Sequence, residues 1–408
     1  MSVLEMAFWL SALVAAYAYV GYGIVISALA AMRPRPHLRG AIRPSVALII
    51  AAHNEEAVIR EKIVNSLRQT YPRERLEIVV VSDGSTDATP AIVQEYQHEG
   101  VVSLYQPARM GKAAAMQRAA ENTRSEILVF SDANSMYTPD TIENLVRNFA
   151  DPQVGCVSGE KQIRAQGQMG AVKTSGLYWR YESYLKRMDS KVNSVVGAAG
   201  EIFATRRSLF RPAESDSIIE DFVISMRIAA AGHRVIYEPE AISVEEVAAS
   251  TADEYERRVR ISAGGFQSIV RLRRILISRR WLLIFQYLSH RVLRWAVVPF
   301  LLPVLLLTNI ALAYQPLYQG LLALQLILVA LAGAGWACGM LGMGSPRLTR
   351  VPFYFYMLNV AALVGFYRYI SGRQKVTWTR TRRLASEKTT GGPTVLSQAI
   401  RRGSIKEQ

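Results

Sequence analysis

The sequence SVALIIAA (residues 45–52), followed directly by HNEE (residues 53–56), decides the fold. A short, continuous apolar run of this kind is typical of a strand that is buried on both faces, as in a parallel sheet. The polar residues after it begin a loop, and we expect a helix from about residue 56 to residue 69. These residues therefore predict the first strand and helix of an α/β domain.

The same unit repeats along the next 60 residues. We expect strands at residues 76–82, 101–105 and 127–131, and helices at residues 87–98 and 111–122. Strands that alternate with helices of this length indicate a doubly wound α/β sheet, in which ligands bind at the carboxyl ends of the strands. Asp83 and Asp132 each follow such an end. Both are therefore candidates for a ligand site.

A later helix start also carries acidic residues. Glu220 and Asp221 open an apolar helical pattern that stops at Gly232. Asp221 is therefore expected in a first helical turn, where acids are common because the helix dipole favours them.

Two long runs of the chain contain no charged side chain. Residues 6–32 form the first, and residues 295–346 form the second. Both exceed the roughly 20 residues that a helix needs to cross a bilayer. We interpret residues 1–32 as a retained amino-terminal anchor, because no basic residue precedes the apolar run as in a signal peptide. Residues 295–370 are expected to hold two or three further spans, of which residues 351–367 would be marginal in length.

The positive charge of the chain lies beside these apolar runs. The formal net charge is +15, and residues 31–44, 257–294 and 373–408 together carry +21, which leaves −6 for the remainder. A basic rim beside membrane spans follows from the positive-inside bias and favours contact with a lipid bilayer, so nucleic acid is not an expected partner. We therefore expect a basic linker at residues 33–44, interfacial helices at residues 257–294 and a disordered basic tail at residues 371–408.

This charge pattern also predicts the location of the protein. The basic segments place the soluble domain on the cytoplasmic side of the inner (plasma) membrane. Three carboxy-terminal spans would leave the basic tail on the outer side, against the same bias, so the number of spans stays open. The two cysteines, Cys156 and Cys338, are far apart, and the five histidines show no metal-ligand spacing. A disulfide framework or zinc site is therefore not expected.

Five ordered motifs carry a resemblance to a known family. They are AHNEE (residues 52–56), VVSDGSTD (80–87), RMGK (109–112), SDAN (131–134) and IED (219–221). In this order they resemble the family 2 inverting glycosyltransferases, which include cellulose, hyaluronan, chitin-oligosaccharide and poly-N-acetylglucosamine synthases. The resemblance covers about residues 45–267. It implies a nucleotide-sugar-binding, glycosyltransferase A-type domain at residues 45–256 and a nucleotide diphosphate sugar as donor.

The resemblance also assigns the catalytic and metal-binding roles. Asp221 matches the family's base, which takes the proton of the acceptor hydroxyl as that oxygen attacks the anomeric carbon and forms a β-linkage. Glu220 would be its polar neighbour on the acceptor side. Asp132 would hold Mg²⁺ or Mn²⁺ together with the donor phosphates. The family usually has Asp-x-Asp at this place, whereas this chain offers the neutral amide of Asn134.

Further residues match the family's donor pocket. Asn54, Glu55 and Asp83 would contact the nucleoside, and Lys112 would approach the diphosphate. Arg257 and Arg260 lie in RRVRI (residues 257–261), which matches the family's Gln-x-x-Arg-Trp. The planar guanidinium of Arg260 is suited to diphosphate oxygens.

The same stretch departs from the pattern of the processive members. Ile261 replaces their tryptophan and cannot stack on a sugar ring, which puts chain elongation in doubt. Gly200, in the small-residue loop at residues 197–204, would let backbone approach the acceptor closely.

Three functions remain open at this point. The first is transfer of one sugar to a lipid-linked or glycan acceptor, which the altered RRVRI stretch favours. The second is a processive polysaccharide synthase coupled to secretion, which the several spans favour. The third is a non-catalytic nucleotide-sugar-binding subunit that assembles with other subunits of a synthase complex.

Overall fold

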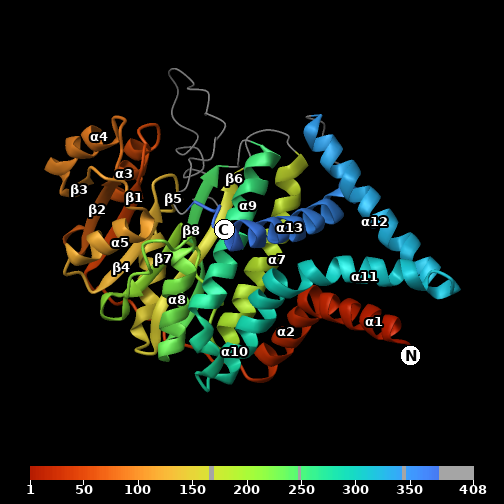
Figure 1. Cartoon of the computed structure of the whole chain (residues 1–408). Helices are drawn as coiled ribbons and strands as arrows, with labels where there is room; N and C mark the ends of the chain where they lie inside the picture. Colours follow the sequence, from red (N-terminus) through yellow and green to blue (C-terminus); the bar gives the residue numbers. More distant parts are fainter. Residues whose placement is uncertain (165–169, 247–249, 342–345, 376–408) are drawn as a thin grey trace, which may run out of the picture.

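A computed structural model describes residues 1–164, 170–246, 250–341 and 346–375. An α/β domain lies at one end of the molecule, and long helices extend from it at the other end (Figure 1). The tail that we expect to be disordered lies, after residue 375, outside the described residues. The strands are β1 Val46–Ala52, β2 Leu76–Asp83, β3 Val101–Gln106, β4 Ile127–Asp132, β5 Met136–Tyr137, β6 Val154–Arg164, β7 Ile202–Arg206 and β8 Arg234–Glu246.

These strands form one mixed sheet with the order β3-β2-β1-β4-β7-β6-β8-β5. The first four are parallel, as expected for a doubly wound sheet. β7 runs antiparallel to both β4 and β6, while β6 and β8 are parallel to each other. β1 therefore lies in the middle of the parallel half, and all seven of its residues are buried.

Helices cover both faces of the sheet, which confirms the α/β class. On one face, Leu48 and Ile50 of β1 pack with residues of α3 and α6; on the other, Ala47 and Ile49 pack with residues of α5 and α8. The helices of this domain are α3 Ile59–Leu67, α4 Thr89–Glu95, α5 Lys112–Glu121, α6 Thr141–Val146, α7 Gly170–Val192 and α8 Glu220–Ala231. α8 begins at Glu220 and is capped at its carboxyl end by Gly232, whose φ of 110° favours glycine.

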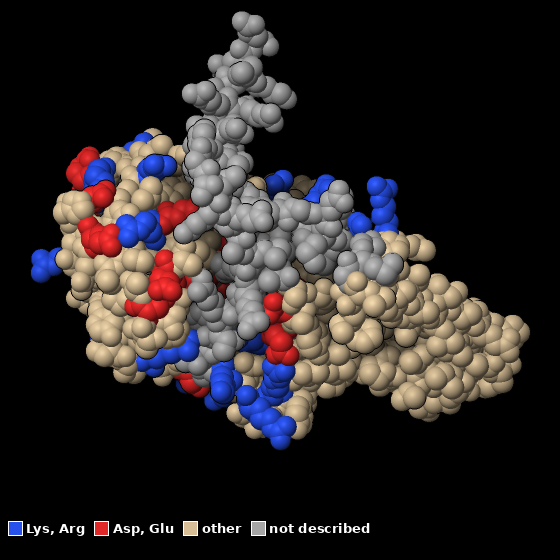
Figure 2. Space-filling view, turned by 90° about the horizontal axis from the view of Figure 1, so that it is seen from above, with Lys and Arg blue, Asp and Glu red and all other residues tan. Residues whose placement is uncertain are grey.

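Among the described residues, four helical stretches are long and apolar enough to cross a membrane: Val3–Met32, Trp281–Leu312, Pro316–Met340 and Arg347–Ile370. The first contains α1 Val3–Ala16 and α2 Tyr22–Met32, and the second contains α10 Trp281–Tyr287 and α11 Val298–Leu312; each pair is joined by a π-helical turn. The third and fourth are α12 and α13. In Figure 2 the end of the molecule where α1, α11 and α12 lie in Figure 1 shows a surface with no blue or red side chains, and hence no visible Lys, Arg, Asp or Glu.

Helix α9 (Thr251–Arg271) connects the α/β domain to these apolar helices. A Cβ on Gly365 of α13 would meet Ser262 and Val259 of α9, so the two helices are in close contact. Residues 281–294, which we expected at the membrane surface, belong to the same continuous helical stretch as α11. α13 has 24 residues, so the segment that looked marginal from its sequence is long enough to span.

Candidate active site

The ends of β1, β2 and β4 meet at one edge of the sheet, as their parallel pairing requires. Asp83 at the end of β2 is buried and accepts hydrogen bonds from the backbone amides of Met110 (2.8 Å) and Gly111 (2.7 Å). Asn54, in the left-handed region with φ 53°, accepts from the amide of Thr86 (2.8 Å). The Asp83 and Asn54 side chains therefore hold the two loops that surround this edge.

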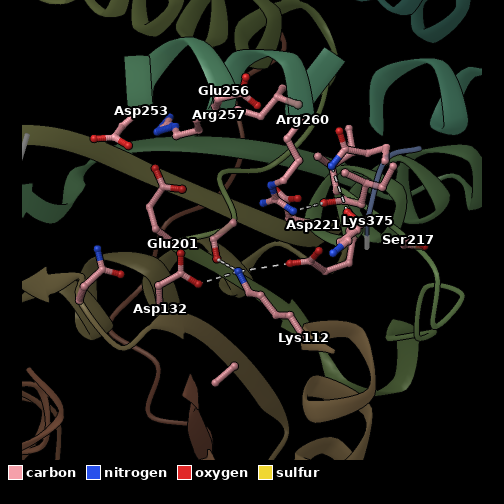
Figure 3. A pocket seen from close by; sticks show the side chains of 18 of the residues that line it. Lys112, Asp132, Glu201, Ser217, Asp221, Asp253, Glu256, Arg257, Arg260 and Lys375 are labelled. Carbon is pink, nitrogen blue, oxygen red and sulfur yellow. Dashed lines mark hydrogen bonds and ion pairs between the residues drawn. The ribbon is translucent and has the colours of Figure 1, made fainter. Parts of the chain in front are cut away.

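A cavity of about 700 Å³ opens beside these loops, and it brings together most of the residues predicted from the sequence. Figure 3 shows side chains of several elements converging on it. Predicted site residues that line it are Glu55, Lys112, Asp132, Asn134, Gly200, Glu220, Asp221, Arg257 and Arg260. Asn54 and Asp83 are not among the residues that line the cavity.

Lys112, the first residue of α5, occupies the centre of the site. Its amine lies 2.6 Å from Asp132 and 3.2 Å from Glu220, and it donates to the carbonyl of Gly200 at 3.1 Å (Figure 3). Burial alone would lower the pKa of Lys112, but the carboxylates of Asp132, Glu220 and Asp221 raise it above its usual value. Lys112 is therefore a fixed positive charge among three acids.

Asp221 lies in the first turn of α8, as predicted, and its carboxylate faces Gly200. A Cβ on Gly200 would lie 3.1 Å from this carboxylate and 3.4 Å from the Lys112 amine, so glycine allows the two to approach. Burial and the neighbouring Glu220 carboxylate together raise the pKa of Asp221 to about 7, although Lys112 lowers it. A carboxylate with a pKa near the working pH is suited to act as a general base.

Asp132 and Asn134 lie on the same wall of the cavity and offer oxygen ligands. Within the described ranges, no group of three or more His, Cys, Asp or Glu side chains is arranged to hold a metal. This donor set still fits Mg²⁺ or Mn²⁺, because such ions often take one or two protein ligands together with substrate phosphates and water. A tightly held metal cage built from protein ligands alone is not present in this part of the chain.

The RRVRI stretch lies on α9 above the cavity, and its arginines point in different directions. Arg257 and Arg260 line the cavity, and Arg260 donates to the carbonyl of Ile218 at 3.1 Å. Arg258 is buried instead and stacks within 5.2 Å of the rings of Tyr178 and Trp179. The helical period explains this difference, since neighbouring residues on a helix face different sides.

Several lining residues were not predicted from the sequence. Lys161 of β6, Glu201, and Glu245 of β8 form one wall, and the end of α13 contributes Tyr367 and Arg368 near the rim. Glu201 directly follows the predicted Gly200, which was the available signal for it. Lys161 and Glu245 carry no local signal, because strand pairing brings them together across 84 positions.

Known proteins resemble parts of this chain. Residues 47–212 match the model of glycosyl transferase family 2. Over 232 residues the chain is 25% identical to poly-beta-1,6-N-acetyl-D-glucosamine synthase of Staphylococcus aureus (strain COL) and 23% identical to that of Staphylococcus epidermidis. Each of these alignments covers 55% of this chain and 56% of the relative. The matched part is therefore little more than half of these relatives.

The mannosyltransferase PcManGT from Pyrobaculum calidifontis, solved in complex with GDP-Man and Mn2+, shares the fold. It superposes with a TM-score of 0.70 at 24% identity, covering 91% of this chain and 100% of that chain. Residues 47–212 are thus similar to glycosyl transferase family 2, the chain has a GT-A-like α/β domain, and it is distantly similar to the poly-N-acetylglucosamine synthases over about half of their length.

Proposed function

We propose that this protein is a membrane-bound inverting glycosyltransferase that moves a sugar from a nucleotide diphosphate donor to a lipid-linked or glycan acceptor. The observation that carries this proposal is the position of Asp221. Its side chain lines the cavity near Lys112, whose amine forms an ion pair with Asp132. A base and a site for a polyanionic leaving group thus lie within one cavity.

In the proposed reaction the acceptor hydroxyl loses its proton to Asp221. The freed oxygen attacks the anomeric carbon from the face opposite the diphosphate, the bond from that carbon to the phosphate oxygen breaks, and the nucleotide diphosphate leaves. The electron pair of the broken bond stays on the leaving group. Lys112, Arg257 and Arg260 would stabilise its negative charge, since each lines the cavity. The result is a linkage of inverted, β configuration.

Asp132 and Asn134 are the residues that would hold the divalent metal. When bound, such an ion stabilises the charge that develops on the leaving diphosphate. Because Asn134 is neutral, it leaves one negative charge fewer at this site than a second aspartate would. We therefore propose weaker metal binding than at an Asp-x-Asp site.

The apolar helices support a membrane location, with the catalytic domain on the cytoplasmic side of the inner membrane. The basic segments that flank the spans favour this orientation. Ile261 lines the cavity at the place where the processive members carry tryptophan. Transfer of one sugar is therefore favoured over processive synthesis.

The test is donor turnover by the detergent-purified protein. Nucleotide release is measured for a panel of nucleotide sugars with Mn²⁺ or Mg²⁺, with membrane lipids supplied as acceptor. We expect release for at least one donor, and a loss of about 10³-fold or more in Asp221→Asn. Glu95→Gln, which removes an exposed acid on α4, is the matched control and should retain activity.

The rival function makes a different prediction in the same assay. A non-catalytic subunit would bind a nucleotide sugar without turning it over. Binding without release for every donor would therefore contradict the assignment of Asp221 and favour a subunit of a synthase complex.

A further inference from the structure

One wall of the cavity is built from charged residues that the proposed reaction does not use. Lys161 of β6, Glu201 and Glu245 of β8 form this wall, which we call the acceptor wall. The Lys161 amine lies 2.6 Å from Glu245 and 3.4 Å from Glu201. Ser135 donates to the second oxygen of Glu245 at 2.6 Å. Each of the three charged side chains is thus held in a fixed position.

The acceptor wall is next to the proposed base. Glu201 directly follows Gly200, the residue that Asp221 and Lys112 both approach. Its charge is also among those that raise the pKa of Asp221. Figure 3 shows Glu201 on the Asp132 side of the cavity, facing the helix that carries Asp253 and Arg257. A molecule held against this wall would therefore lie beside the Asp221 carboxylate.

Stability alone does not explain this group of charges. The side chains of Lys161 and Glu245 are 7% and 10% exposed, so both ions have lost most of their water. Such a buried pair is often no more stabilising than apolar side chains of the same size, because desolvation offsets the attraction. Its position on the wall of a cavity therefore points to a ligand.

The charges also indicate what kind of ligand fits. Two carboxylates and one ammonium give the wall a net charge of −1, which disfavours a phosphate. Sugar hydroxyls suit it, because each can donate to a carboxylate and accept from the ammonium. A hydroxyl nucleophile also requires a base such as Asp221, whereas a phosphate is already ionised.

We propose that Lys161, Glu201 and Glu245 bind the ring hydroxyls of an acceptor sugar, so that the nucleophile is a sugar hydroxyl and not a lipid phosphate. This inference rests on the proposed function and specifies its acceptor. Ile261 of α9 and Val364 and Tyr367 of α13 line the same cavity. They provide an apolar surface for an alkyl chain attached to that sugar.

The experiment measures transfer to defined acceptors with two variants of the wall. The probes are octyl glycosides, methyl glycosides and a polyprenyl phosphate. Glu201→Gln removes one carboxylate, and the double variant Lys161→Met with Glu245→Gln removes a buried pair together, which avoids an unpaired buried charge. Glu95→Gln is again the control, and nucleotide affinity, measured by calorimetry, reports on folding.

We expect transfer to octyl glycosides, with weaker transfer to methyl glycosides and none to the polyprenyl phosphate. In both wall variants KM for the octyl glycoside should rise about tenfold or more, since hydrogen bonds to charged groups are lost. Nucleotide affinity should stay within about twofold. Transfer to the polyprenyl phosphate, or an unchanged acceptor KM in both variants, would overturn the proposal while leaving glycosyl transfer intact.

Failure of the proposed function would be distinguishable. If the wild-type protein turns over no donor, binding of the octyl glycosides in the presence of nucleotide diphosphate still tests the wall. Binding that weakens about tenfold in Glu201→Gln would support the acceptor wall. No binding to the wild-type protein, or equal binding to both, would refute it.

Discussion

The midpoint of the pH–rate profile should move up or down when the charges around Asp221 are changed. As the proposed base, Asp221 must be ionised, so kcat should fall as the pH decreases through its pKa of about 7. Lys112 lowers this pKa and Glu220 raises it. Lys112→Met should therefore raise the midpoint of the profile, and Glu220→Gln should lower it.

The size of the Lys112 effect follows from the geometry at Gly200. The Lys112 amine and the Asp221 carboxylate lie 3.4 Å and 3.1 Å from the same point, so they are no more than about 6.5 Å apart. At an effective dielectric constant of about 20, unit charges at this separation interact by about 2.5 kcal/mol, or almost two pH units. Partial exposure to solvent in the open cavity reduces this, so we expect an upward movement of about one pH unit.

The assay is the initial rate of nucleotide release at saturating donor and metal between pH 5.5 and 9.5. Saturation separates the effect on Asp221 from any loss of donor affinity in Lys112→Met. The midpoints of the two variants should lie on opposite sides of the wild-type midpoint. Midpoints that coincide, or that both move in the same direction, would refute the electrostatic account of Asp221.

Two further changes test other parts of the site, and a third tests a buried ion pair outside it. Asn134→Asp supplies a second carboxylate, and the Mn²⁺ concentration for half-maximal rate should fall about tenfold in a metal titration; no decrease would place the metal elsewhere. Gly200→Ala puts a Cβ 3.1 Å from the Asp221 carboxylate, so kcat should drop about tenfold or more with little change in nucleotide affinity. Glu182→Gln removes the buried carboxylate that lies 2.5 Å from Arg294, and should lower the free energy of unfolding by about 3–5 kcal/mol. The melting temperature in detergent should therefore fall, and an unchanged melting temperature would contradict a stabilising role for this ion pair.

The parallel half of the sheet could be predicted from the sequence for a physical reason. Strands buried on both faces must be apolar throughout, and the polar residues that follow mark their carboxyl ends. The positions of Glu55, Asp132 and Asp221 at the cavity follow from that pattern and from one helix start. The family resemblance then suggested which of these residues carries each role.

Other features depend on contacts between distant parts of the chain and have no local pattern. The acceptor wall joins β6 to β8. The role of Asp83 depends on hydrogen bonds that it accepts from the backbone amides of residues 110 and 111. The antiparallel direction of β7 likewise follows from the path of the chain between strands. Hydrophobic periodicity detects burial, but it does not detect which buried segments are neighbours.

The most direct test of the central claim is the anomeric configuration of the transferred sugar. The product formed from the active donor and an octyl glycoside is examined by proton NMR, and the coupling at the new anomeric centre is compared with that of the donor. Asp221 as a single base predicts complete inversion, and Asp221→Asn should give no product. A product that retains the donor configuration, or undiminished transfer by Asp221→Asn, would contradict the account.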